Sequence, residues 1–329
     1  MGSYDQLNMT ALERLDLWDK TRLEALMPIN ILLFLCAAVG VFGNGVVIYI
    51  YGLRLYKQHA GRYFIPYLAV ADLLAVVLSV EHHTVSNFYP VTNKLERLCK
   101  WNYMAAFFAT VFSVGILLII AVQRYLKVCK PFGGQMTLFW RRFALSLCFM
   151  FSLALAVTAY FTFGLEKIYN KELNVTGTTC RRLTSSSQTF TLIHSATCTL
   201  FVVTEGAALI VLYWKIGKVV FRQRKQNLGE SKEKKTNTSL MFMIITIIFL
   251  VSFLPRMITS IIEGIKVGLW ETLNEKAYAT VRMLEVLYIV NNLANPFVYA
   301  FMDVKFVSEF KKTIPCRKKI EEVKSLSNS

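Results

Sequence analysis

Several charged side chains lie inside long apolar stretches of this 329-residue sequence. They are Asp72, Glu81, Glu205, Arg256 and Glu285. Three histidines, His82, His83 and His194, lie toward the ends of the same stretches. Burying an ionised group is unfavourable unless the group is paired or hydrogen-bonded. We therefore expect these side chains either to pair with one another or to contact a ligand.

Asp72 is the only charged residue of the segment LAVADLLAVV. Polar residues at matching depth in other apolar segments are Asn44, Ser113, Asn291, Asn292 and Asn295. A carboxylate among amides and a hydroxyl supplies oxygen ligands, which suit a small hard cation. The sequence thus predicts a sodium site at Asp72, Ser113, Asn291 and Asn295. A hydrated polar network without an ion is the alternative, and both readings stay open at this point.

Seven apolar segments must position these residues. They run roughly over 28–53, 64–88, 101–123, 143–164, 189–214, 240–265 and 278–302. About 20 mostly apolar residues span a bilayer as a helix, and a single segment can satisfy its backbone hydrogen bonds in lipid only as a helix. The fold class predicted is an all-α membrane protein, a seven-transmembrane helix bundle.

Composition and charge agree with membrane insertion. Hydrophobic residues make up 55% of the chain, charged residues 18%, and the mean hydropathy is +0.45. The net charge of +16 would suit a nucleic-acid binder, but it follows membrane topology instead. With the C-terminus in the cytoplasm, the inner loops and tail hold 23 Lys and Arg, against 13 outside. We expect a multi-pass protein with an extracellular N-terminus, anionic lipid as a neighbour, and no nucleic-acid partner.

Cysteines and glycosylation signals test this orientation. Cys99 and Cys180 are the two cysteines that fall on the predicted outer side, where disulfides persist. We predict that they pair; two free thiols are the alternative. The sequons at Asn8 and Asn174 also fall outside, so both asparagines are predicted glycosylation sites.

Further motifs occur in a characteristic order along the chain. They are Gly43-Asn44, the stretch 68–72 (LAVAD), Cys99, Arg124-Tyr125, Cys180, Tyr213, Phe249, Pro255 and the stretch 295–299 (NPFVY). With this set over essentially its whole length, the chain resembles the rhodopsin-like class of G protein-coupled receptors, as a divergent, orphan-like member. The resemblance implies a plasma-membrane receptor that activates a heterotrimeric G protein, with arrestin as a further candidate partner.

The resemblance also implies a switch toward the cytoplasm. Its residues would be Arg124, Tyr125, Tyr213, Pro255, Pro296 and Tyr299. Both prolines remove a backbone donor and can act as hinges. Where the family usually has an acid before the arginine, this chain has Gln123, which predicts raised basal activity. The common tryptophan two residues before Pro255 is Phe253, and Glu205 lies near the usual proline of span five.

Residues 303–315 are predicted to form an amphipathic helix on the membrane surface. Phe306, Phe310 and Ile314 recur every four residues among lysines. Cys316 follows as a candidate palmitoylation site; an unmodified cysteine is the alternative. The predicted organisation is an extracellular N-terminus at 1–27, the transmembrane domain at 28–302, this helix, and a cytoplasmic tail at 316–329.

An outer cavity between spans three, five, six and seven is the ligand site that the resemblance implies. Residues 103–107 contain no aspartate for an amine, and residues 278–302 no lysine for retinal. We expect the ligand-binding residues to be Arg256, Glu285, His83, His194 and Phe253. Arg256 and Glu285 either pair with each other or hold opposite ends of a ligand.

The favoured ligand is therefore a peptide or small zwitterion; a lipid is the alternative. From another class, a seven-span transporter would favour two related repeats, which the sequence lacks. It also lacks paired carboxylates in a catalytic motif or an HExxH-type metal motif, so neither an enzyme nor a metal centre is expected.

Overall fold

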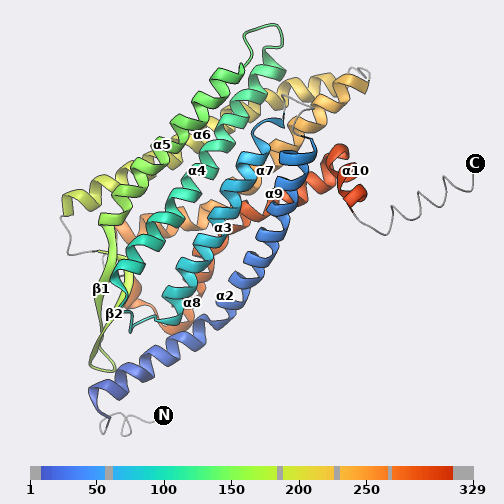
Figure 1. The fold of residues 1–329 in the computed structure, drawn as a ribbon. Coiled ribbons are helices and arrows are strands. Elements are labelled where there is room, and N and C mark those ends of the chain that lie inside the picture. Colours follow the sequence, from blue (N-terminus) through green and yellow to red (C-terminus); the bar gives the residue numbers. More distant parts are fainter. Residues whose placement is uncertain (1–8, 56–61, 184–187, 226–229, 266–268, 314–329) are drawn as a thin grey trace, which may run out of the picture.

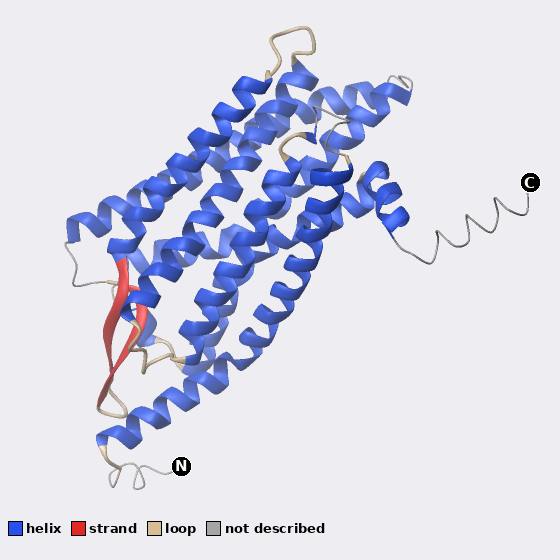
Figure 2. Cartoon of the chain, viewed as in Figure 1, coloured by secondary structure: helices blue, strands red, loops and turns tan. Residues whose placement is uncertain are grey.

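The computed structural model describes residues 9–55, 62–183, 188–225, 230–265 and 269–313. Long helices lie side by side in an elongated bundle (Figure 1). A two-stranded hairpin, drawn in red in Figure 2, lies at one end, and the short helix α10 lies at the other. We call these the hairpin end and the α10 end.

The helical elements follow the predicted apolar segments. Their bounds are α2 (Ala11–Val47), η1 (Ile48–Arg54), α3 (Ile65–Phe88), α4 (Glu96–Cys129), α5 (Leu138–Thr162), α6 (Gln188–Lys225), α7 (Glu230–Ile265), η3 (Leu269–Thr272), α8 (Glu275–Glu285), η4 (Val286–Tyr288), α9 (Ile289–Met302) and α10 (Val304–Thr313). Within the described residues, six helical segments are each long and apolar enough to cross a membrane.

The seventh crossing is made of three pieces, α8, η4 and α9. A single 3-10 turn at Val286–Tyr288 separates the two α-helices. Pro296 lies farther along, inside α9, and Pro255 lies inside α7. The interruption in this crossing is therefore at Val286–Tyr288, whereas the sequence pointed to the proline.

The first helix begins well before its predicted start at residue 28. It starts at Ala11, where the Thr10 and Glu13 side chains each cap the other's backbone N–H. Such a capping box satisfies two of the orphan donors at a helix N-terminus. Residues 11–27, which precede the first apolar segment, thus form one continuous helix with it.

The hairpin joins α5 to α6 and was not predicted. β1 (Phe163–Asn170) pairs antiparallel with β2 (Val175–Arg182), with Asn170 opposite Val175. Asn174 lies in the turn at φ 48°, a left-handed conformation that asparagine tolerates better than most residues. The disulfide Cys99–Cys180 is present and ties β2 to the first turn of α4. This prediction is confirmed.

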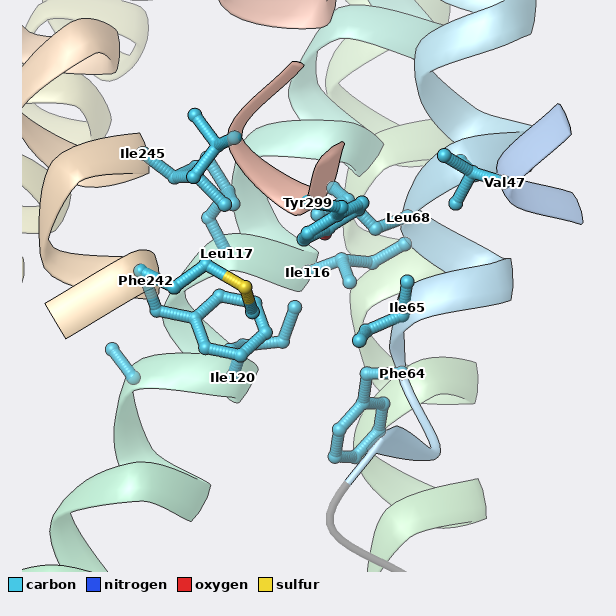
Figure 3. Packing of buried hydrophobic residues seen from close by; sticks show 14 of the residues in the cluster. Val47, Phe64, Ile65, Leu68, Ile116, Leu117, Ile120, Phe242, Ile245 and Tyr299 are labelled. Carbon is cyan, nitrogen blue, oxygen red and sulfur yellow. The ribbon is translucent and has the colours of Figure 1, made fainter. Parts of the chain in front are cut away.

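The largest buried apolar cluster fills the half of the bundle toward the α10 end. Figure 3 shows Leu68, Ile116, Phe242 and Tyr299 converging from α3, α4, α7 and α9. Since lipid is as apolar as these side chains, close packing holds the helices together here more than transfer from water does. The hairpin half carries the cavity.

Candidate functional site

A cavity of about 980 Å³ opens beneath the hairpin. Its walls come from α2, α3, α4, the hairpin, α6, α7, η3, α8 and η4. All five predicted ligand-binding residues line it: His83, His194, Phe253, Arg256 and Glu285. Concave sites of about 300–1,000 Å³ commonly bind small ligands, so this one is at the large end of that range.

Arg256 and Glu285 pair with each other at the bottom of the cavity. The Arg256 Nη1 donates to Oε1 of Glu285, and Arg282 Nη1 donates to Oε2 of the same carboxylate at 3.1 Å. Arg282 also donates to Oδ1 of Asn87 at 3.2 Å. Of the two readings that the sequence left open, the structure has the ion pair, and it adds a second arginine to it.

Aromatic and imidazole groups surround this ion pair. His83 Nε2 lies 3.2 Å from the Tyr288 hydroxyl, and the Phe253 ring centre lies 5.7 Å from that of Tyr288. On the opposite wall, His194 Nδ1 lies 2.8 Å from the Thr158 hydroxyl. The wall therefore combines apolar ring faces with a few polar groups, as in sites that orient a ligand.

The N-terminal part of α2 forms one side of the cavity mouth. Arg22 donates to both carboxylate oxygens of Glu275 on α8, at 3.0 and 3.2 Å. Its guanidinium also lies 4.1 Å from the centre of the Tyr278 ring. Trp18, one turn earlier, packs with Val91 and the hairpin residue Ile168. This helix, the hairpin and α8 are thereby joined around the mouth.

The polar centre predicted around Asp72 is assembled in the middle of the bundle. Ser113 donates to one carboxylate oxygen of Asp72, and Asn295 Nδ2 donates to the other at 2.6 Å. Asn291 donates to Asn292, and Asn44 donates to the Asn292 carbonyl at 2.9 Å. Asp72, Ser113, Asn291 and Asn295 are all at most 1% exposed.

Four of the predicted switch residues, Arg124, Tyr125, Tyr213 and Tyr299, lie between this centre and the α10 end. Pro255 instead lies inside α7, between the cavity residues Phe253 and Arg256. Arg124 is buried, with its guanidinium 4.8 Å from the centre of the Phe242 ring on α7. Tyr213 and Tyr299 are buried in the same apolar cluster. Tyr125 lies at the edge of that cluster, with Lys215 Nζ 5.8 Å from its ring centre. These side chains come from four helices.

An ionic cluster at Asp303 holds α10 against the first loop, and the sequence gave no indication of it. Arg62 donates to both oxygens of Asp303 at 2.8 and 2.9 Å, and Tyr51 donates at 2.7 Å. Asp303 also accepts from the Lys305 backbone at the start of α10. Burial raises the pKa of Asp303, but Arg62 and Tyr51 outweigh burial, so the pKa lies below its ordinary value.

The sequence also matches a known protein family. Residues 43–299 match the family described as 7 transmembrane receptor (rhodopsin family). The chain belongs to this family.

Relatives of the receptor match most of the chain but share little of its sequence. Neuromedin-U receptor 2 of Rattus norvegicus is 23% identical, over 88% of this chain and 75% of the relative. Adenosine receptor A3 of Canis lupus familiaris is 27% identical, over 85% and 87%. Neuropeptide FF receptor 2 of Rattus norvegicus is 22% identical, over 88% and 72%.

Family membership establishes the general function. The receptor is a multi-pass membrane protein that binds an extracellular ligand and couples to a G protein. Its relatives are signalling receptors and not enzymes. The prediction of a rhodopsin-like receptor is confirmed.

Modification sites are placed only in part. Asn174 is exposed at the hairpin turn, where its Oδ1 accepts from the Tyr169 hydroxyl at 2.6 Å. Glycosylation there stays a prediction. Asn8 and Cys316 lie outside the described residues.

Two parts of the cavity wall, Arg282 and the Arg22–Glu275 pair, were not predicted from the sequence. Arg282 precedes Glu285 by three residues, a spacing that brings two helical side chains together, so this partner could have been found. Arg22 and Glu275 are far apart in the chain, and no local pattern links them. Only the folded bundle brings the N-terminal helix to the cavity mouth.

Proposed function

We propose that the receptor binds a peptide or another small polar ligand in the cavity beneath the hairpin. One observation carries this proposal, the group of charged residues at the bottom of a cavity of about 980 Å³. A lipid receptor would favour an apolar cavity without these charges. Neuropeptide FF receptor 2 is named for a peptide, and adenosine receptor A3 for a nucleoside. The size of the cavity favours the peptide of the two.

The proposed orientation places the hairpin end outside the cell and the α10 end in the cytoplasm. The disulfide supports it, because disulfides persist in oxidising compartments. The excess of Lys and Arg in the loops and tail of the other end supports it as well. An N-terminal tag should then be stained on intact cells and a C-terminal tag only after permeabilisation. The reverse staining would overturn the orientation.

Signalling is proposed to work by a shift between two helix packings. A ligand favours the packing to which it binds more tightly, and by no more than that difference in affinity. In the active packing α7 moves away from α4 at the α10 end. A G protein helix then enters beside Arg124, Tyr213 and the basic loop around 215–235. Arrestin is proposed to use the same opening.

A pair of neighbouring substitutions on α6 tests the cavity as the ligand site. Val202 lines the cavity, whereas Val203 is 51% exposed on the outside of the bundle. Val202→Trp should fill the cavity and abolish the response to any agonist found in a peptide and metabolite screen. Val203→Trp should leave the response intact, and both variants should keep ligand-free signalling. Equal agonist potency in the two variants would refute the proposal.

We also propose that the Asp72 centre holds a sodium ion. The centre offers the Asp72 carboxylate and three further oxygen atoms. These are the amide oxygens of Asn44, Asn291 and Asn295, which have no hydrogen-bond partner among the described residues. Oxygen atoms of this kind fit a hard cation, which would supply positive charge beside the carboxylate. Sodium chloride should then raise the Tm of purified receptor more than choline chloride does, and Asp72→Asn should remove the difference. Equal stabilisation by both salts would speak against the ion and for the hydrated network.

A further inference from the structure

Charge on the cavity wall is balanced near the mouth. Arg22 binds Glu275 at 3.0 Å, and Arg181 on β2 binds Glu271 on η3 at 2.7 Å. Arg182 faces Glu263 at 3.9 Å. In the hairpin turn, Lys171 is adjacent to Glu172, and both line the cavity. Each basic side chain of this upper part thus has an acidic counterpart.

The bottom of the cavity is not balanced. Two arginines, Arg256 and Arg282, share the single carboxylate of Glu285. Glu285 is the fifth acidic residue among the described residues that line the cavity, and the two arginines are the fifth and sixth basic ones. One positive charge is therefore left over around Glu285.

The arginines also cover the carboxylate. The side chain of Glu285 is 2% exposed, whereas those of Arg256 and Arg282 are 29% and 17% exposed. A ligand that reaches the bottom meets guanidinium groups and not carboxylate oxygens. An ammonium group would find repulsion there, and a carboxylate would find donors.

Ring faces lie next to this charge. Phe253 and Tyr288 line the cavity beside Arg256, and Tyr103 lines it from α4. They offer apolar surface to the part of a ligand that follows its charged end. A site of this kind suits an anion attached to an aromatic or aliphatic body.

We infer that the ligand carries a carboxylate on an apolar body, and that this carboxylate binds Arg256 and Arg282 at the bottom of the cavity. The inference rests on the proposed use of the cavity as the ligand site. It narrows the range of proposed ligands. Glu285 is covered by the two arginines, so it cannot hold the ammonium end of a zwitterion whose carboxylate binds Arg256. A free peptide C-terminus and a small aromatic acid offer the same chemistry. Arginine binds carboxylates bidentately in charge-assisted hydrogen bonds.

Two matched pairs of compounds test the inference on purified receptor in lipid nanodiscs. One pair is N-acetyl-phenylalanyl-leucine and its C-terminal amide, and the other is 3-phenylpropanoate and its amide. Binding is measured as the dependence of Tm on compound concentration. In at least one pair the acid should bind about tenfold or more tightly than the amide, a factor worth about 1.4 kcal/mol. The pair that shows the preference separates a peptide terminus from a small acid.

Variants assign the preference to the bottom of the cavity. Arg256→Gln should reduce the acid-to-amide ratio to about one, whereas Arg256→Lys should retain part of it because the charge remains. Arg97→Gln, at an exposed arginine of α4 that does not line the cavity, is the control and should keep the wild-type ratio. If Arg256→Gln folds poorly, the acid-to-amide ratio of the wild-type receptor still tests the inference, because that measurement needs no variant.

Equal binding of acid and amide in both pairs would overturn the inference. So would failure of all four compounds to bind a preparation that still promotes nucleotide exchange on G protein, or an unchanged ratio in Arg256→Gln. The proposed ligand site is judged separately by Val202→Trp. If that variant abolishes agonist responses while acid and amide bind alike, the cavity is the ligand site and only the carboxylate inference fails.

Discussion

The Asp303 cluster leads to a quantitative prediction about how α10 is held. The carboxylate is 3% exposed and accepts two hydrogen bonds from Arg62 and one from Tyr51. Asp303→Asn preserves the shape and one acceptor oxygen but removes the charge. Arg62 then loses its partner in a largely buried position, because its own side chain is 18% exposed.

The size of the effect follows from these contacts. Removing one partner of a buried ion pair costs about 3–5 kcal/mol. Since Arg62 can reach water through its exposed part, we expect the lower end, about 3 kcal/mol. An unfolding entropy of about 2.1 cal/mol/K per residue gives about 0.7 kcal/mol/K for a chain of this length, so Tm should fall by about 4 °C.

Thermal unfolding of purified receptor in detergent measures this shift. Arg54→Gln is the control, because Arg54 lies 3.9 Å from Glu309 at the same end of the bundle and its side chain is 40% exposed. Because this contact is long and Glu309 also pairs with Lys312 at 2.7 Å, the variant should leave Tm nearly unchanged. A double-mutant cycle of Arg62→Gln with Asp303→Asn should give a coupling of at least about 1 kcal/mol. Equal Tm shifts in Asp303→Asn and Arg54→Gln, with no coupling in the cycle, would refute the reasoning.

Three further predictions follow. The folded pKa of Asp303 is depressed, so its contribution to stability is present above the unfolded pKa of about 3.9 and is lost as pH falls through the folded value. The Tm difference between wild type and Asp303→Asn should therefore stay constant from about pH 8 to 5 and shrink below about pH 4. A Tm difference that grows in acid would contradict this. Gln123→Glu should lower ligand-free signalling in a second-messenger assay, because an acid beside Arg124 stabilises the resting packing more strongly than an amide does; unchanged basal output would count against it. Glu205 is 3% exposed, and neither carboxylate oxygen has a hydrogen-bond partner among the described residues, so Glu205→Met should raise the free energy of unfolding by about 1–3 kcal/mol; a lower Tm would show that this carboxylate is satisfied.

Local chemistry in the sequence was sufficient for the class of fold and for the deepest polar residues. A segment of 20 or more apolar residues has one way to satisfy its backbone in lipid, so the helices could be derived from composition alone. The same rule identified Asp72, Arg256 and Glu285, since a charge inside such a segment needs a reason to be there. All three lie at the predicted centre or at the cavity.

Helix ends were harder to place, because they depend on local caps and not on hydropathy. The capping box at Thr10 and Glu13 extends the first helix outside the apolar segment. The 3-10 turn at Val286–Tyr288 interrupts a segment that hydropathy treats as one helix. The hairpin consists of two short strands between membrane segments, where the strand signal is weak.

The sequence alone was sufficient to predict seven membrane-crossing helices. It also identified the charged and polar side chains whose exposure to lipid would be unfavourable. Tertiary structure decided how those charges are shared. Arg256 meets Glu285, Arg22 meets Glu275 and Arg62 meets Asp303 only because separate helices and loops pack together. The physical reason is range: hydropathy acts on each segment by itself, whereas an ion pair requires two side chains to be brought within about 4 Å by the packing of the whole bundle.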